Sequence, residues 1–131
     1  MSTAFAKPAQ GTPAEGALYS FIAALSAGEL SAATACFTRE GCMVTPDGTA
    51  VHGRAAIAPI LAQLIARRTE IEVEQLAIHT AKDVALAGGR LAIRSQGPDG
   101  SVLVQPCSPT VALQRVEGVW KIAVLAPWAK S

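Results

Sequence analysis

The chain has 131 residues, of which 50% are hydrophobic and 16% are charged. This balance excludes a disordered tail, a collagen-like repeat and a disulfide-dense miniprotein, and the length suits one domain with one core. The 11 Lys and Arg residues are nearly matched by 10 Asp and Glu residues, and the basic side chains are scattered. We therefore expect a compact globular domain with no nucleic-acid partner.

The start of the chain and its cysteines bear on location. Residues 1–11 lack the basic segment and apolar run of a secretory signal, and no 18 apolar residues stand together, so we expect no membrane segment. Cys36, Cys42 and Cys107 have no Cys-x-x-Cys spacing, which suits reduced thiols in a reducing compartment. We expect a cytoplasmic protein with a flexible tail, residues 1–11, and a single domain, residues 12–131.

A stripe of apolar residues predicts the first helix. Thr12 can cap this helix and Pro13 can occupy its first position, where the missing N–H group of proline costs nothing. Gly28 can adopt the left-handed conformation that ends many helices. The helix is therefore expected to begin near Pro13 and to turn one face toward a core. The residues of this face follow the spacing i, i+3, i+4 and i+7: Leu18, Phe21, Ile22 and Leu25.

Two more helices are expected in the first half of the chain. Ser31 can cap a short helix that reaches Phe37, and a strand over residues 42–45 follows it. The third helix comes after Gly53 and contains Pro59. Because proline fits comfortably only in a first turn, this helix either begins later than Gly53 suggests or bends at Pro59.

From residue 69 onward the hydrophobic period changes to two, which predicts strands. The apolar phase slips between Val73 and Leu76, as a β-bulge would cause. A similar slip occurs across Gly88–Gly89, which suggests a second bulge. Both slips predict a strongly curved sheet.

The pattern of the remaining strands is sufficient to predict the fold class. Residues 101–116 predict one long strand, interrupted by Pro106 and Pro109, which favour a sheet edge or a bulge because proline cannot donate to the ladder. Glu117–Gly118 is a two-residue turn into a last strand over residues 119–126. We expect an α+β fold with three N-terminal helices packed on a strongly curved, mainly antiparallel sheet.

Several segments in a characteristic order carry a resemblance to known proteins. They are Phe21–Leu30, Phe37, the strand before Pro46, Val51–Arg54 and Gly118–Ile122. Together they resemble the SnoaL-like and ketosteroid-isomerase-like families, which share the cone-shaped fold of nuclear transport factor 2. In these families the cone encloses an apolar pocket, often in a homodimer, and activities range from isomerisation and polyketide cyclisation to ligand binding. The resemblance therefore implies a fold and not one reaction.

The resemblance also allows the catalytic positions to be compared. Ketosteroid isomerases use an Asp base, a Tyr and a protonated Asp; the matching positions here are Thr45, Phe21 and the segment between Thr110 and Ala112. None of these can act as a base near pH 7 in the manner of a carboxylate, and Phe21 has no hydrogen-bond donor. The chemistry of that enzyme is therefore not expected.

His79 is the best remaining candidate for a catalytic base, because imidazole titrates near neutral pH. It has no neighbouring Asp or Glu, so a histidine on the surface or on a dimer face is the simpler interpretation. A nucleophilic pair of Cys107 with His79 is a further alternative. The two histidines lack a carboxylate at ligand spacing, so we expect no metal site and no cofactor.

Two functional hypotheses follow. In the first, the domain binds a small apolar molecule in the cone pocket, and its enzymatic version is an isomerase or cyclase with a non-standard acid or base. In the second, the pocket is filled by its own side chains and the domain is a non-catalytic binding or dimerisation module. A homodimer joined through the sheet face away from the helices is expected. The expected pocket residues are Leu18, Phe21, Leu25, Thr45, Leu61 and Thr110.

Overall fold

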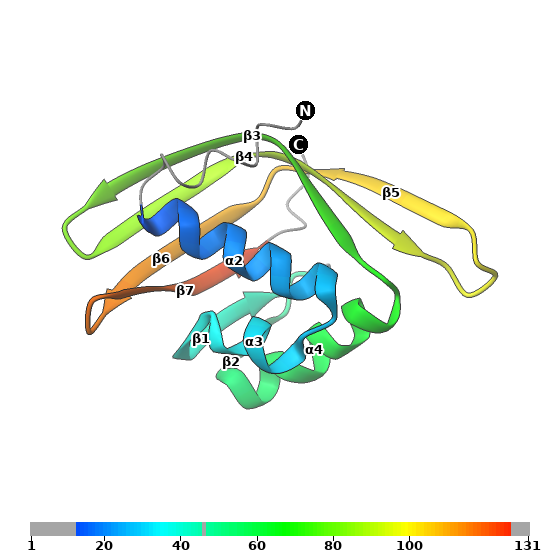
Figure 1. Ribbon diagram of the computed structural model, residues 1–131, viewed down its shortest axis with the longest axis horizontal. Helices are drawn as coiled ribbons and strands as arrows, with labels where there is room; N and C mark the ends of the chain where they lie inside the picture. The colour runs from blue at the N-terminus through cyan, green and yellow to red at the C-terminus, as the bar shows by residue number, and fades with distance from the viewer. Residues whose placement is uncertain (1–12, 46, 127–131) are drawn as a thin grey trace.

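Three helices lie within the curve of one sheet in the computed structural model, which describes residues 13–45 and 47–126 (Figure 1). The helices are α2 (Pro13–Ala27), α3 (Leu30–Ala35) and α4 (Arg54–Ala66). The strands are β1 (Phe37–Val44), β2 (Ala50–His52), β3 (Glu70–Ala81), β4 (Val84–Gln96), β5 (Val102–Cys107), β6 (Thr110–Val116) and β7 (Val119–Ala126). This arrangement confirms the predicted α+β fold. The predicted tail, residues 1–11, lies outside the described residues.

The seven strands follow the order β2-β1-β7-β6-β4-β3, and β5 pairs with β4 beside this path. The β1–β7 pair is parallel and the other pairs are antiparallel. β4 pairs with β6 over Val84–Gly88 and with β5 over Leu91–Gln96. The single long strand predicted for residues 101–116 is therefore two strands, because each pairs with a different half of β4 and Pro109 stands between them.

The ends of α2 follow the sequence signals, whereas the start of α3 does not. α2 runs from Pro13 to Ala27, and Gly28 follows it with a left-handed φ of 78°. Thr12, the predicted cap, lies outside the described residues. The N–H group of Glu29 donates to the Ala24 carbonyl oxygen at 2.9 Å, which completes the helix end. α3 begins at Leu30, with Glu29 at its N-cap, so the prediction that Ser31 caps this helix is wrong.

β1 is longer than expected because its first residues pair with a distant strand. It begins at Phe37, where the sequence predicted the end of a helix, and Phe37 pairs with Ile122 of β7. β2 was not predicted and has only three residues. α4 begins directly after Gly53, so the question left by Pro59 is answered: the proline lies inside the helix, on its exposed side.

The bulge predicted between Val73 and Leu76 is confirmed. The register of β3 against β4 shifts between Val73 and Gln75, which leaves Glu74 unpaired. Gly88–Gly89, where a second bulge was predicted, is instead the point at which β4 passes from β6 to β5. At this point the β3–β4 pair curves over α2 (Figure 1).

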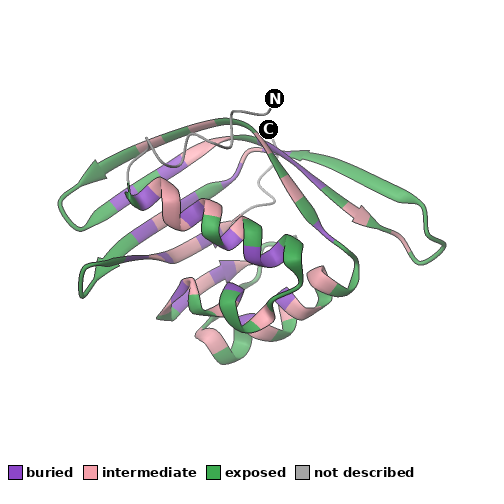
Figure 2. Cartoon of the chain, viewed as in Figure 1, coloured by how far each residue is buried: buried purple, intermediate pink, exposed green. Residues whose placement is uncertain are grey.

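The core lies between α2, α4 and the inner face of the sheet. Figure 2 shows buried positions on these helices and along the strands that face them. Phe21 and Phe37 meet edge to face with ring centres 5.4 Å apart, which joins α2 to β1. Ile57 and Leu61 of α4 are fully buried in the same cluster. The helices thus close the narrow end of the cone and leave the space between α2 and β3–β4 as the place for a cavity.

Candidate functional site

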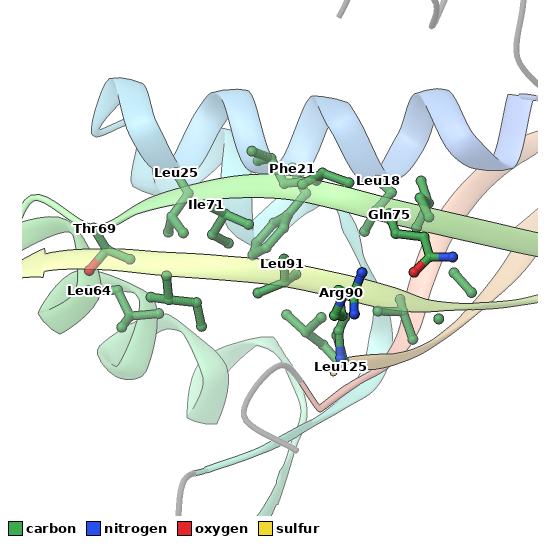
Figure 3. Close-up of a pocket in the computed structure, with 18 of the residues that line it drawn as sticks. Leu18, Phe21, Leu25, Leu64, Thr69, Ile71, Gln75, Arg90, Leu91 and Leu125 are labelled. Carbon is green, nitrogen blue, oxygen red and sulfur yellow. The ribbon is translucent and has the colours of Figure 1, made fainter. Parts of the chain in front are cut away.

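A small cavity lies between α2 and the inner faces of β3 and β4 (Figure 3). Its volume is about 40 Å³. A water molecule needs roughly 10–15 Å³ measured in this way, whereas pockets for drug-sized ligands have about 300–1,000 Å³. In this form the cavity is large enough for one small apolar group. The side chains that line it are mainly aliphatic or aromatic and include Leu18, Phe21, Ile22, Leu25, Met43, Leu64, Ile71, Leu76, Leu91, Ile93, Val111 and Leu125.

Thr69 places a hydroxyl group in this apolar wall. The residue is 2% exposed, and its Oγ1 atom has no hydrogen-bond partner among the described residues. Its backbone N–H group donates to the Leu64 carbonyl oxygen at 3.0 Å, after Arg68 has ended α4 with a left-handed φ of 53°. An unpaired buried hydroxyl costs about 1–3 kcal/mol. The Thr69 hydroxyl is therefore unpaired but covered, so a ligand oxygen can reach it only after a neighbouring side chain moves.

Gln75 and Arg90 lie at the other part of the cavity and contribute apolar atoms to its lining. They face each other across the β3–β4 ladder, and both are exposed residues that also line the cavity. Figure 3 shows Thr69 and Leu64 at one end of the group and Gln75 at the other. The Arg90 guanidinium forms no ion pair with any described residue. Gln75 and Arg90 thus mark the solvent-facing side of the cavity.

A wider cleft adjoins the cavity on the side of α4 and β5. Its volume is about 560 Å³, and it shares Leu64, Thr69 and Ile93 with the cavity. The two spaces are therefore separated by a wall that these three side chains form. The remaining residues of the cleft are mostly polar: Thr45, Asp47, Ile60, Gln63, Arg67, Ser95, Leu103 and Gln105.

Asp47 is the carboxylate of this cleft, and hydrogen bonds hold it in its ionised form. The Thr45 hydroxyl donates to Oδ1 of Asp47, and the Thr49 backbone N–H donates to the same oxygen at 3.1 Å. These bonds, that of Thr45 first, lower the pKa of Asp47. A carboxylate with a lowered pKa and an engaged oxygen is a weak proton acceptor near neutral pH.

The expected pocket residues fall in three different places. Leu18, Phe21 and Leu25 line the cavity, as the stripe on α2 implied. Thr45 lines the cleft and not the cavity.

Leu61 and Thr110 lie outside both spaces. Leu61 is fully buried in the core, and Leu64, almost one turn later on α4, reaches the cavity in its place. Thr110 is exposed, because the alternation of β6 turns the next residue, Val111, toward the cavity.

The structure places His79 and Cys107 away from the cavity and away from each other. His79 is exposed on the sheet face opposite to that of Ile78 and lines neither the cavity nor the cleft. Cys107 is buried, and burial raises the pKa of its thiol. His79 pairs with Leu86 of β4 and Cys107 pairs with Leu91. These positions are separated by roughly 16 Å along the strand, which is too far for a nucleophile–base pair.

The sequence analysis missed Thr69, Gln75 and Arg90. The phase slip at the bulge was the available signal for Gln75, because a bulge changes which side chains face inward. Nothing in the local pattern distinguishes Thr69 from an ordinary first residue of a strand. Its burial comes from α4 and β4, which are brought together when the Gln96 N–H group donates to the Arg67 carbonyl oxygen at 2.8 Å.

Residues 13–45 and 47–126 form neither a cluster of metal ligands nor a membrane-spanning helix. No group of three or more His, Cys, Asp or Glu side chains in these ranges could hold a metal ion. None of the helices described there is long and apolar enough to cross a bilayer.

Comparisons with solved structures show the same fold. An uncharacterised protein with a cystatin-like fold from Caulobacter vibrioides superposes with a TM-score of 0.76 at 19% identity, covering 89% of this chain and 87% of that chain. An NTF2-like protein with a cystatin-like fold from Novosphingobium aromaticivorans gives 0.72 at 14% identity, covering 87% and 77%. The epoxide hydrolase/cyclase-like enzyme SalBIII, described in pyran ring formation in the polyether salinomycin, gives 0.70 at 17% identity, covering 88% of each chain.

Comparison with family models identifies the family itself. No curated protein matches the sequence. The model of the SnoaL-like domain matches residues 15–125, which includes all the helices and strands described above except the first two residues of α2 and the last residue of β7. The chain belongs to the SnoaL-like family.

Proposed function

We propose that this domain binds a small, largely apolar molecule between α2 and the β3–β4 pair. The observation that carries the proposal is an apolar cavity whose wall contains a buried hydroxyl without a partner, that of Thr69. Binding sites for small molecules combine apolar walls with a few fixed polar groups in this way. Since the cavity is about 40 Å³, a bound molecule must either widen it or extend beyond it.

Binding without turnover fits the site better than an isomerase or a cyclase does. Either reaction needs a base within hydrogen-bond reach of the proton that it removes. The described residues that line the cavity include no His, Asp, Glu or Cys, and Asp47 in the cleft has a lowered pKa. SalBIII shares the fold, but 17% identity transfers no reaction to this chain. Catalysis is therefore the alternative that a turnover assay must test.

The test is to fill the cavity and measure the binding of an apolar fluorescent probe. Leu18→Phe adds volume at a residue that lines the cavity, and Ala55→Leu adds apolar volume at an exposed residue of α4 that lines neither space. We expect anilinonaphthalene sulfonate to bind the unmodified protein and the Ala55→Leu control, and to bind Leu18→Phe at least tenfold more weakly. Equal binding by all three proteins would contradict the proposal. Native mass spectrometry of freshly purified protein would also detect a retained molecule.

A second proposal concerns assembly, and exposed apolar side chains favour it. Val84 and Leu86 on β4, together with Val116 and Val119 at the β6–β7 turn, are 41–55% exposed. The alternation of the strands and the register of β4, β6 and β7 place all four on the sheet face away from the helices. A patch of this kind on a small protein is typical of a protein interface. We infer that a second copy of the chain covers it in a two-fold homodimer.

A further inference from the structure

We propose that the ligand is amphipathic and spans the wall between the cavity and the cleft. Its short apolar end would occupy the cavity, an acceptor oxygen would bind the Thr69 hydroxyl, and its polar remainder would lie in the cleft. This inference rests on the function proposed above and names the class of ligand. It follows from the sizes of the two spaces, from the wall that they share and from the position of one unpaired hydroxyl.

Size excludes a whole ligand from the cavity, and the unpaired Thr69 hydroxyl argues against a ligand that lies in the cleft alone. The cavity of about 40 Å³ admits a methyl or ethyl group but not a whole metabolite, whereas the cleft has about 560 Å³ and falls in the usual range for ligand sites. A ligand confined to the cleft would leave the apolar cavity empty and the Thr69 hydroxyl unpaired. A ligand that extends through both spaces would fill the cavity and give the Thr69 hydroxyl a partner.

The wall itself can open. Leu64, Thr69 and Ile93 line both spaces. Leu64 lies in the last turn of α4 and is only half-buried, so a rotamer change there displaces no core side chain. Thr69 is held by its backbone bond to the Leu64 carbonyl oxygen, so its hydroxyl stays at the boundary when the leucine side chain moves.

The chemistry of the lining sets the order of groups along the ligand. The cavity side of the wall is aliphatic, and the Thr69 hydroxyl can donate one hydrogen bond to a carbonyl, hydroxyl or ether oxygen at the boundary. Gln63, Arg67 and Gln105 lie on the cleft side.

The Arg67 guanidinium forms no ion pair with the described residues. Asp47 lines the same cleft, but its Oδ1 atom already accepts hydrogen bonds from Thr45 and Thr49. Arg67 is therefore the group that would bind a carboxylate in the polar remainder.

The experiment uses two probes that differ in one group. Levulinate has a methyl group, a carbonyl oxygen and a carboxylate in the required order, and 4-methylpent-4-enoate replaces the carbonyl oxygen by a methylene group of similar shape. Binding is followed by NMR through the methyl signals of Leu64 and Ile93, which line both spaces. We expect levulinate to bind the unmodified protein at least tenfold more tightly than its isostere.

Variants at Thr69 assign this preference to the hydroxyl. Thr69→Val should bind the two probes equally, Thr69→Ser should keep the preference for levulinate, and the exposed Thr80→Val on β3 is the matched control. Melting curves of each variant show that it is folded. Equal binding of both probes by the unmodified protein, or a preference that survives in Thr69→Val, would overturn the inference.

The same measurements separate the two proposals. If neither probe shifts the methyl signals but anilinonaphthalene sulfonate still binds in a cavity-dependent manner, the amphipathic ligand is wrong and the binding function stands. If all three molecules fail to bind, both proposals fall.

Discussion

Gly89 lies against the backbone of Gln75 so closely that a Cβ atom at position 89 would stand 2.0 Å from the Gln75 carbonyl oxygen. The φ of Gly89 is 150°, in the region that side chains disfavour. The bulge of β3 at Glu74 lies next to this contact. Gln75 is the residue after the bulge on β3, and Arg90 is the residue after Gly89 on β4. Both line the cavity. One glycine thus permits the bend that forms the solvent-facing side of the cavity.

Replacing this glycine should destabilise the fold strongly. In Gly89→Ala the new methyl group meets backbone atoms that cannot move independently, so we expect a loss of about 3 kcal/mol or more in the free energy of unfolding. Gly100→Ala is the control, because Gly100 also has a positive φ, of 84°, but nothing lies near its Cβ position; it should lose only about 1 kcal/mol. Urea unfolding measures both, and similar losses in the two variants would contradict the close contact.

Removing the Thr69 hydroxyl should stabilise the unliganded protein. Valine keeps the shape of threonine and removes an unpaired buried polar group, so we expect Thr69→Val to raise the free energy of unfolding by about 1 kcal/mol. Thr80→Val on the surface should change it by less than about 0.5 kcal/mol. Urea unfolding again provides the measurement. A loss of stability in Thr69→Val would mean that the hydroxyl is already paired in solution.

Two thiols that are shielded from water make the free energy of unfolding depend on pH in the alkaline range. Burial raises the pKa of Cys36, an effect that Lys121 partly offsets, and burial also raises the pKa of Cys107. Each thiol is therefore more easily ionised in the unfolded chain than in the folded one. The resulting stability is complete below the unfolded pKa and is lost as the pH rises through the folded pKa.

We therefore expect the free energy of unfolding to fall above about pH 9, and to fall less steeply in a Cys36→Ala, Cys107→Ala variant. A thiol reagent at pH 8 should label the half-buried Cys36 and Cys42 before Cys107, which is 1% exposed. Labelling of Cys107 first under native conditions would contradict this order.

Short-range patterns in the sequence were sufficient for the helices and the main bulge. The stripe on α2 predicted the Leu18, Phe21 and Leu25 face, and the phase slip predicted the shift of register after Val73. These features depend on spacing within one element, which the sequence displays directly.

Features that depend on distant pairing were not predictable in the same way. β1 starts at Phe37 because that residue pairs with Ile122 of β7, and the division of residues 101–116 follows from the two partners of β4. Thr69 is buried only because α4 and β4 converge on it. In each case the deciding contact joins segments far apart in the chain, which a local pattern cannot show.

The proposed homodimer predicts a response to charge on the outer face of the sheet. Leu86→Arg places one charge per copy in the apolar patch and, because the interface is two-fold, brings both charges into it. We expect light scattering to give about twice the chain mass of 13.5 kDa for the unmodified protein at micromolar concentration, and the single chain mass for the variant. Ala55→Arg, at an exposed position of α4 outside the sheet, is the control and should remain dimeric. A single chain mass for the unmodified protein would remove the proposal.

Steroid isomerisation is the reaction that the resemblance to ketosteroid isomerases most readily suggests, and the site predicts that it does not occur. Thr45 stands at the base position, lies in the cleft and donates its hydroxyl to Asp47. Phe21 stands at the donor position and packs against Phe37. A positioned base and a donor to the enolate oxygen each lower the barrier by roughly 3–5 kcal/mol, so losing both removes the catalytic advantage. The ultraviolet absorbance of the conjugated product should rise no faster with the protein than in buffer when a β,γ-unsaturated ketosteroid is added. Turnover well above that background would show that another group in the cone acts as the base, and the proposal of binding without catalysis would then be wrong.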